Sequence, residues 1–188
     1  MRVMPNWCEN KLILTGSNEE RERFKEAVKG FPAVYPEEQG DNPQEEVEQF
    51  FTFNSMVPVP DYVLQAGYSE AGYEWQSSHW GTKWDVGKDE VVIVEEDDTH
   101  ITYHFSTAWS PPLPWVEKVS LFFPSLTFEL QYLEEGMFFA GYHIFEQGSL
   151  REEEVIQEDH ARFRWFLGEK FEYDDDYIDE FMENYTEY

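Results

Sequence analysis

The chain has 188 residues, of which 40 are acidic and 13 are lysine or arginine, and its formal net charge at pH 7 is -27. Hydrophobic residues make up 41% and aromatic residues 18%, which is too much for a disordered chain and predicts one folded domain with additions. Nucleic acids and anionic membrane surfaces are bound through lysine and arginine, so this charge argues against direct binding of either. It favours a basic partner, although strong surface charge also serves solubility alone.

The amino terminus and the cysteine content bear on the cellular compartment. The stretch MRVMPNWCENKLILTG has too short an apolar run for a signal peptide or a membrane span, because polar residues from Asn6 to Lys11 interrupt it. We therefore expect a cytoplasmic protein. The single cysteine, Cys8, excludes an intramolecular disulfide and a zinc site made of several thiolates.

The first predicted elements are a strand and a helix. Residues 7–15 alternate between two faces, one of them lined by Cys8, Leu12 and Leu14, which predicts a strand. Ser17 and Glu20 then have the spacing of a capping box, and Gly30 is placed to end the helix that they begin.

An acidic loop and a second strand are predicted next. Residues 32–48 carry three prolines and six carboxylates without a basic residue, which predicts a solvated loop inserted into the domain. The run QFFTFN, at 49–54, predicts a strand that Pro58 and Pro60 stop, because proline cannot donate a ladder hydrogen bond.

Two strand pairs with a helix between them follow. Their predicted order is strand 90–95, strand 100–107, a helix that begins at the prolines after Ser110 and ends at Pro124, strand 126–133 and strand 137–145. Together with the first strand, the first helix and the strand at 49–54, this order predicts an α+β fold with the split βαβ pattern of a ferredoxin-like antiparallel sheet, extended by extra strands.

The character of the chain changes after residue 146. Residues 146–188 contain fifteen acidic residues against four basic ones, yet keep enough aromatic residues to dock on a neighbouring surface. We therefore predict a ferredoxin-like domain over 1–146 and an acidic helical extension over 147–188 that packs on it, with disorder of the extension as the alternative.

Three motifs resemble a known family. They are MPNWCENKLILTG at 4–16, WGTKWD at 80–85, and FSTAWSPP at 105–112 followed by LFFPSLTFELQYLEEGMFFAG at 121–141. In this order they are similar to the YubB-like ferredoxin-like domain family, which occurs in bacteria and often on plasmids, phages and other mobile elements. The resemblance covers about residues 4–145. It implies a ferredoxin-like fold and no reaction.

The motif HWGTKWDVG, at 79–87, contains the candidate site. Lys83 lies between Trp80 and Trp84 and can cover an indole face while pairing with Asp85, which would fasten an irregular loop to the sheet. The alternative is a functional amine or anion anchor with a pKa lowered by apolar neighbours. The structural interpretation is favoured, because no base is identifiable near Lys83.

No catalytic residue, metal site or cofactor is predicted. The five histidines are dispersed and do not form the i, i+4 pair of a helical zinc site. The acidic run at 172–184 lacks the glycine and the final glutamate of a calcium loop. A phosphate-binding glycine loop and a serine-nucleophile elbow are also missing from the sequence.

Two classes of function remain. The first, which we favour, is a non-enzymatic protein-interaction or inhibitor module of mobile-element origin whose carboxylates imitate nucleic acid and bind a basic nucleic-acid-binding protein. The second is a small-ligand-binding domain or enzyme with a cleft lined by Trp80, Lys83, Trp84, Asp85 and Trp109. The sequence predicts neither the identity of the partner nor the oligomeric state.

Overall fold

The centre of the molecule is a six-stranded antiparallel sheet with the strand order β2-β3-β1-β4-β5-β6. The structure, a computed structural model, describes residues 6–36, 47–87, 90–157 and 159–185. The strands are β1 (Trp7–Thr15), β2 (Val92–Glu96), β3 (His100–Ala108), β4 (Thr127–Glu134), β5 (Phe139–Glu146) and β6 (Ser149–Gln157). The first four form the predicted ferredoxin-like sheet, and β5 and β6 extend it beyond β4.

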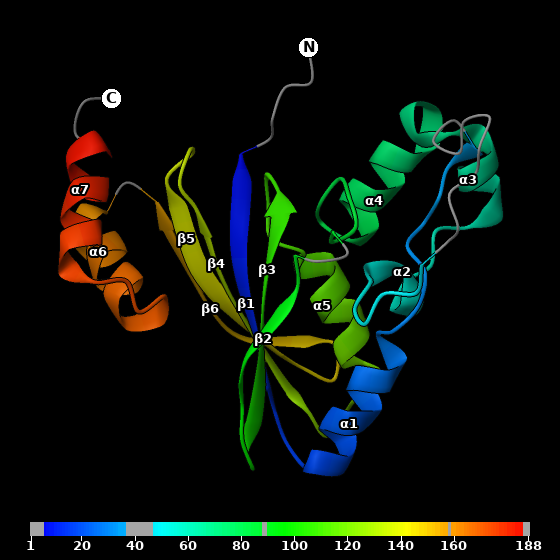
Figure 1. Ribbon diagram of the computed structural model, residues 1–188, viewed down its shortest axis with the longest axis horizontal. Coiled ribbons are helices and arrows are strands. Elements are labelled where there is room, and N and C mark those ends of the chain that lie inside the picture. Colours follow the sequence, from blue (N-terminus) through cyan, green and yellow to red (C-terminus); the bar gives the residue numbers. More distant parts are fainter. Residues whose placement is uncertain (1–5, 37–46, 88–89, 158, 186–188) are drawn as a thin grey trace.

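Helices cover both faces of this sheet. They are α1 (Asn18–Ala27), α2 (Phe53–Met56), α3 (Asp61–Ala66), the π-helical turn η2 (Tyr68–Gly72), α4 (Tyr73–His79), α5 (Leu113–Ser120), α6 (His160–Lys170) and α7 (Asp175–Tyr185). Figure 1 shows α1 and α5 on one side of the sheet, which we call the inner face, and α6 and α7 on the other side, the outer face. None of the helices traced is long and apolar enough to cross a membrane.

The first strand and helix form as predicted. Along β1 the side chains of Cys8, Leu12 and Leu14 are buried, while their neighbours lie on the outer face. The Ser17 hydroxyl accepts a hydrogen bond from the Glu20 amide at 3.3 Å and so caps α1. The strands predicted at 90–95, 100–107, 126–133 and 137–145 correspond to β2, β3, β4 and β5, with ends that differ by at most two residues.

The strand predicted at 49–54 is wrong. This segment makes one isolated bridge, between Gly30 and Gln49, and then turns into the short helix α2. Thr52 caps α2 through its hydroxyl, and the Asp85 carboxylate accepts from the amides of Phe53 and Asn54. Of the aromatic residues that suggested a strand, Phe51 and Phe53 are buried in the core instead of paired in the sheet, and Phe50 is exposed. Most of the predicted acidic loop, residues 37–46, lies outside the described residues.

The inner core is dominated by aromatic side chains. Phe53 packs against Trp115 with ring centroids 4.9 Å apart and against Trp80 at 5.9 Å, and both tryptophans are fully buried. Each indole N–H donates to a backbone carbonyl, so neither burial leaves a polar atom unsatisfied. Trp80 and Trp115 therefore belong to the core.

A second, smaller core lies on the outer face. Leu133, Ala140 and Ile156 from the sheet pack against apolar side chains of α6 and α7. The sheet itself continues past the predicted domain boundary at residue 146, because β6 pairs with β5. The predicted helical extension over 147–188 therefore begins with a strand of the sheet, and its two helices pack on the same sheet. Independent folding of residues 1–146 stays a prediction.

Candidate functional site

The loop after α4 is fastened to the end of β3 and the start of α5. The Thr82 hydroxyl donates to the Ala108 carbonyl at 3.1 Å, and the Ser110 hydroxyl donates to the Gly81 carbonyl at 2.6 Å. Gly81 has a φ of 86°, and a Cβ atom there would lie 2.5 Å from the Pro114 side chain. Only glycine fits this close approach in the left-handed region, so the two loops are held together.

Lys83 projects from this loop between two indoles. Its Nζ atom lies 4.0 Å from the centroid of the Trp84 ring and 3.7 Å from that of Trp109. We call Trp84 and Trp109 the tryptophan clamp. Within the described parts of the chain, the Lys83 ammonium has no ion pair and no hydrogen bond, although only 9% of the residue is exposed. Burial lowers the pKa of Lys83 from its usual value.

The clamp belongs to an exposed aromatic cluster. Trp7 lies with its ring centroid 6.3 Å from that of Trp84, and the two rings are inclined at 50°. The exposed fractions of Trp7, Trp84 and Trp109 are 43%, 38% and 45%. Large indoles so accessible and so close together form an apolar surface of the kind found at interaction sites.

The backbone at Trp109 holds its indole in an unusual position. Trp109 has a φ of 73°, a left-handed conformation that is unfavourable for a bulky side chain. The Trp109 amide donates to the Asn6 carbonyl at 2.9 Å, and the Thr107 hydroxyl donates to the Ser110 carbonyl at 2.7 Å. These bonds keep the turn in place against a strain on the order of 1 kcal/mol or more.

Two of the predicted site residues are not at this surface. Trp80 is fully buried in the inner core, with its indole N–H bonded to the Val57 carbonyl. Asp85 does not pair with Lys83, which corrects the predicted ion pair. Its carboxylate accepts hydrogen bonds from the Thr52 hydroxyl and from the amides of Phe53, Asn54 and Val86. Asp85 therefore holds the start of α2 in place.

Asp85 is partly buried, and its environment acts on its pKa in two directions. Desolvation raises the pKa of this carboxyl, while the four donors around it lower it, and the net shift is upward. Among the described residues, the Asp85 carboxylate makes no ion pair and no hydrogen bond with the Lys83 ammonium. It is therefore not placed to act as a general base for this amine. Of the five predicted residues, Lys83 and the clamp of Trp84 and Trp109 therefore lie together, while Trp80 is fully buried and Asp85 is a partly buried structural residue.

Carboxylates lie at the same end of the sheet as the aromatic cluster. Cys8, next to Trp7, is paired in register with Glu134 of β4. The buried Glu134 carboxylate accepts from the amides of Gly136 and Met137. Burial, followed by the nearby charges of Glu9 and Glu134, raises the pKa of Glu135. The end of the sheet beside the cluster is therefore locally acidic.

A group of potential metal ligands occurs at the β2–β3 turn. Glu95, Asp97 and His100 bring their ligand atoms within 4.8 Å of one another, a juxtaposition that the sequence analysis missed because hairpin pairing creates it. Asp97 accepts from the amides of Thr99 and His100 and from the Thr99 hydroxyl, and these bonds lower its pKa to about 2. Asp97 is thus a turn-capping residue, and exposed groups of this kind commonly carry no ion.

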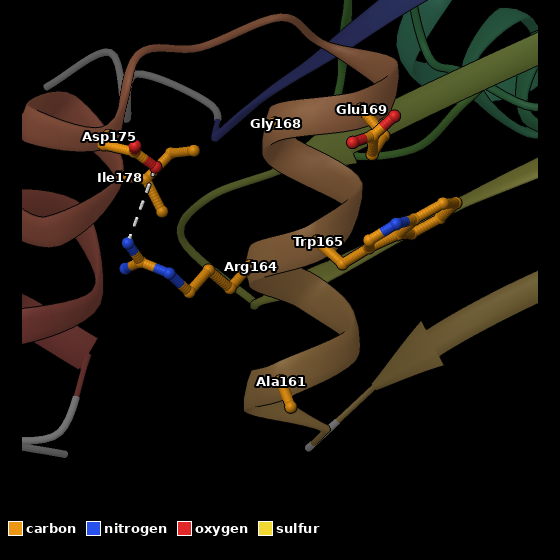
Figure 2. A pocket seen from close by; sticks show the side chains of 7 residues that line it. All are labelled: Ala161, Arg164, Trp165, Gly168, Glu169, Asp175 and Ile178. Carbon is orange, nitrogen blue, oxygen red and sulfur yellow. Dashed lines mark ion pairs between the residues drawn. The ribbon is translucent and has the colours of Figure 1, made fainter.

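Two depressions lie on the outer face, where α6 meets its neighbours. One, of about 280 Å³, lies between α6 and α7, and Figure 2 shows Arg164 reaching across toward Asp175 at 3.7 Å. The other, of about 540 Å³, has β1, β2, β3 and β4 as its floor and the end of α6 as its wall. There Lys11 donates to the Lys170 carbonyl, and Lys170 pairs with Glu129 at 3.3 Å. These contacts join α6 to the sheet.

Comparison with known proteins supports the fold. A family model described as the ferredoxin-like domain in Api92-like protein matches residues 79–180. The solved structure of a protein api92 from Yersinia pseudotuberculosis is similar, with a TM-score of 0.62 over 82% of this chain and 99% of that chain at 11% identity. No curated protein matches. These matches confirm the predicted ferredoxin-like domain, which they describe as Api92-like. The relation to the YubB-like family stays a prediction.

Proposed function

The chain belongs to the family with the Api92-like ferredoxin-like domain, and we propose that it is a non-enzymatic interaction protein that binds a basic partner. The observation that carries this proposal is the excess of carboxylates that the chain does not neutralise. Thirteen basic residues face 40 acidic ones. A surface so charged attracts a basic partner over distances of about a Debye length, roughly 8 Å at physiological salt.

Most basic side chains are already engaged within the molecule. Eight of them lie in ion pairs with aspartate or glutamate: Lys11, Arg23, Lys25, Lys29, Arg151, Arg162, Arg164 and Lys170. The buried Arg21 donates to two backbone carbonyls instead. The remaining carboxylates therefore have few internal cations, and their field is directed toward solvent.

The surface of α7 concentrates this charge. One side of the helix docks on the outer core through Ile178, Phe181 and Met182. The opposite side carries exposed carboxylates at helical spacing, namely Asp175, Asp176, Asp179, Glu180 and Glu183. Of the basic residues described, Arg164 reaches this row, at Asp175 and Asp179. An amphipathic helix with a docked apolar side presents such a row in a fixed position.

The partner that this surface fits is a nucleic-acid-binding protein. A protein that binds phosphates presents lysines and arginines, and the same groups pair with carboxylates. An inhibitor encoded on a mobile element, as the YubB-like resemblance implies, would act by occupying such a surface. This narrower role rests on charge and on the resemblance.

The experiment is a pull-down from host lysate at low salt, repeated at higher salt and with competing DNA or RNA. We expect to recover a basic nucleic-acid-binding protein at low salt and to lose it both at higher salt and with competing DNA or RNA. Salt screens the contacts between the partner's cations and the carboxylates, and nucleic acid competes for the same cations. A variant with Asp175→Asn, Asp176→Asn, Asp179→Asn and Glu180→Gln should lose the partner. A matched variant with Asp61→Asn, Glu70→Gln, Glu74→Gln and Glu117→Gln should keep it. A partner indifferent to salt and competitor contradicts the proposal.

A second candidate is a site for a small ligand, or an enzyme site, at the clamp. The observation that favours it is that Lys83 is only 9% exposed while its ammonium has no counter-ion among the described residues. Catalysis by this amine would need a neighbouring base. Asp85 does not supply one, because its carboxylate accepts hydrogen bonds from the first amides of α2. This candidate is tested by titrating the protein with acetate or benzoate while tryptophan fluorescence is recorded. It requires saturable binding of the anion, and Lys83→Met should abolish that binding.

A further inference from the structure

We propose that the tryptophan clamp is an arginine-binding site, which Lys83 occupies in the free protein and from which an arginine side chain of the basic partner displaces it. The inference rests on the proposed function, since it names the side chain by which the basic partner would be anchored. Three features of the molecule carry it: the geometry of the clamp, the state of Lys83 and the charge around both.

The clamp already has the geometry of a cation site. Two indole faces lie within 4.0 Å of one ammonium nitrogen, well inside the distance of about 6 Å at which a cation is attracted by a ring. A guanidinium suits this arrangement better than an ammonium, because it is planar, stacks on indoles and is more weakly hydrated. The chain itself contains such a pair, since the guanidinium carbon of Arg162 lies 3.8 Å from the Trp165 ring centroid.

Lys83 is held in a way that makes it replaceable. In the part of the chain that the structure describes, no carboxylate or carbonyl accepts from its ammonium, so leaving the clamp breaks no ion pair and no hydrogen bond. Burial lowers its pKa, which means that the charged amine loses hydration in this position. Release into solvent restores that hydration and offsets part of the lost cation–π contact.

The indoles are presented to a partner in advance. All three tryptophans of the cluster are between 38% and 45% exposed. Trp109 is held in its left-handed conformation by the bond from its amide to the Asn6 carbonyl and by the bond from the Thr107 hydroxyl to the Ser110 carbonyl. Strain of this kind persists where the surrounding structure over-determines it, often at ligand clamps. Tryptophan and arginine are also the residues that most often dominate binding energy at protein interfaces.

Charge decides between possible occupants. Glu134 and Glu135 lie at the end of β4, beside the start of β1 and the cluster, and Tyr177 of α7 donates to Glu135 at 3.0 Å. This corner and the net charge of -27 attract a cation and repel an anionic ligand. A second copy of the chain carries the same charge, so self-association is disfavoured. An arginine of a basic partner complements both the indoles and the carboxylates.

The test uses the full chain and an acetylated, amidated hexa-arginine peptide as the probe, with hexa-lysine as the comparison. In ¹H–¹⁵N spectra recorded at low ionic strength, hexa-arginine should shift the indole N–H signals of Trp84 and Trp109. The signals of Trp80 and Trp115 should stay in place, because these indoles are fully buried and serve as internal controls. Hexa-lysine should bind about fivefold more weakly.

Variants then test the displacement. Trp84→Leu and Trp109→Leu should each weaken hexa-arginine binding about fivefold, with folding checked by circular dichroism. Lys83→Ala should strengthen binding about threefold relative to Lys118→Ala, because both remove one positive charge and its stem but only Lys83 competes for the clamp. Lys118 is an exposed residue of α5 and is the matched control.

The outcomes separate this inference from the proposed function. If hexa-arginine binds but neither tryptophan variant weakens it, or if Lys83→Ala weakens it, the clamp is not the arginine site while the acidic surface still binds. If no basic peptide binds at low salt, the proposed function fails as well. If sedimentation shows a dimer that Trp109→Leu dissociates, the cluster is a self-interface and the inference is overturned.

Discussion

The two faces of the sheet are stabilised by different kinds of interaction. On the inner face, Phe24, Phe51, Phe53, Trp80 and Trp115 form a continuous aromatic core. On the outer face a smaller apolar core under α6 and α7 is surrounded by ion pairs such as Lys170–Glu129 and Arg162–Glu154. The difference shows how a chain of such high charge folds: one face excludes water, and on the other the cations of α6 pair with carboxylates of the sheet and of the acidic helix α7.

This comparison predicts different responses to conditions. Burial of aromatic surface does not depend on ionic strength, whereas exposed ion pairs weaken as salt rises. At the same time salt screens the repulsion among the excess carboxylates.

Removing residues 147–188 should have the largest effect. The truncated chain 1–146 keeps the inner core and the four ferredoxin-like strands, so we expect cooperative unfolding. The free energy of unfolding should fall by several kcal/mol, because Leu133 and Ala140, now fully buried, become exposed and β5 loses its partner strand. Denaturant unfolding of 1–146, 1–157 and the full chain measures this. A chain 1–146 that does not fold contradicts the predicted boundary.

Replacing Asp85 should destabilise the inner side by about 3 kcal/mol. Asp85→Ala leaves the amides of Phe53, Asn54 and Val86 without their acceptor in a buried place. Urea unfolding measures the loss. Asp97→Ala is the matched control, because that carboxylate also accepts from two amides but lies at an exposed turn, and its loss should be smaller. Equal losses would contradict the burial of Asp85 as the cause.

Replacing Lys83 should cost about 1 kcal/mol. Lys83→Met keeps the apolar stem and removes the ammonium from between Trp84 and Trp109, so the cation–π contribution is lost. Thermal and denaturant melting measure the change, with Lys118→Met as the control. Unchanged stability would show that Lys83 does not fasten the loop.

The smallest effect concerns pH and His143. Burial lowers the pKa of His143 below its ordinary value of 6.5, although Glu153, at 2.9 Å, acts in the opposite direction. As pH falls, His143 is therefore protonated in the unfolded chain before it is protonated in the folded chain. The stability that neutral His143 contributes is present above pH 6.5 and is lost as pH falls through the lower pKa of the folded state. Melting at about pH 7.5 and about pH 5.5 should show a smaller difference for His143→Gln than for the unmodified chain. An identical difference would contradict the lowered pKa.

Local patterns in the sequence were sufficient for the ferredoxin-like elements. Strand β1 follows from strict alternation over 7–15, and the start of α1 follows from the Ser17 and Glu20 spacing, because both signals act within a few residues. The strand prediction for the segment 49–54 was wrong because it used the same kind of local signal. The aromatic residues of the segment predict a strand, whereas its conformation is set by the Asp85 carboxylate, which lies more than thirty residues away in the chain.

The site shows the same division between local and distant causes. A lysine next to a tryptophan is visible in WGTKWD, and the contact of Lys83 with the Trp84 ring is present as predicted. The second indole comes from Trp109, which pairing of β1 with β3 brings to the start of β1, while Trp80 and Asp85 point into the protein. Composition and short-range pattern thus determine the charge, the elements and the candidate lysine. Which indoles surround it, and where the carboxylates lie, depends on strand pairing and burial, because these contacts join residues that no short pattern relates.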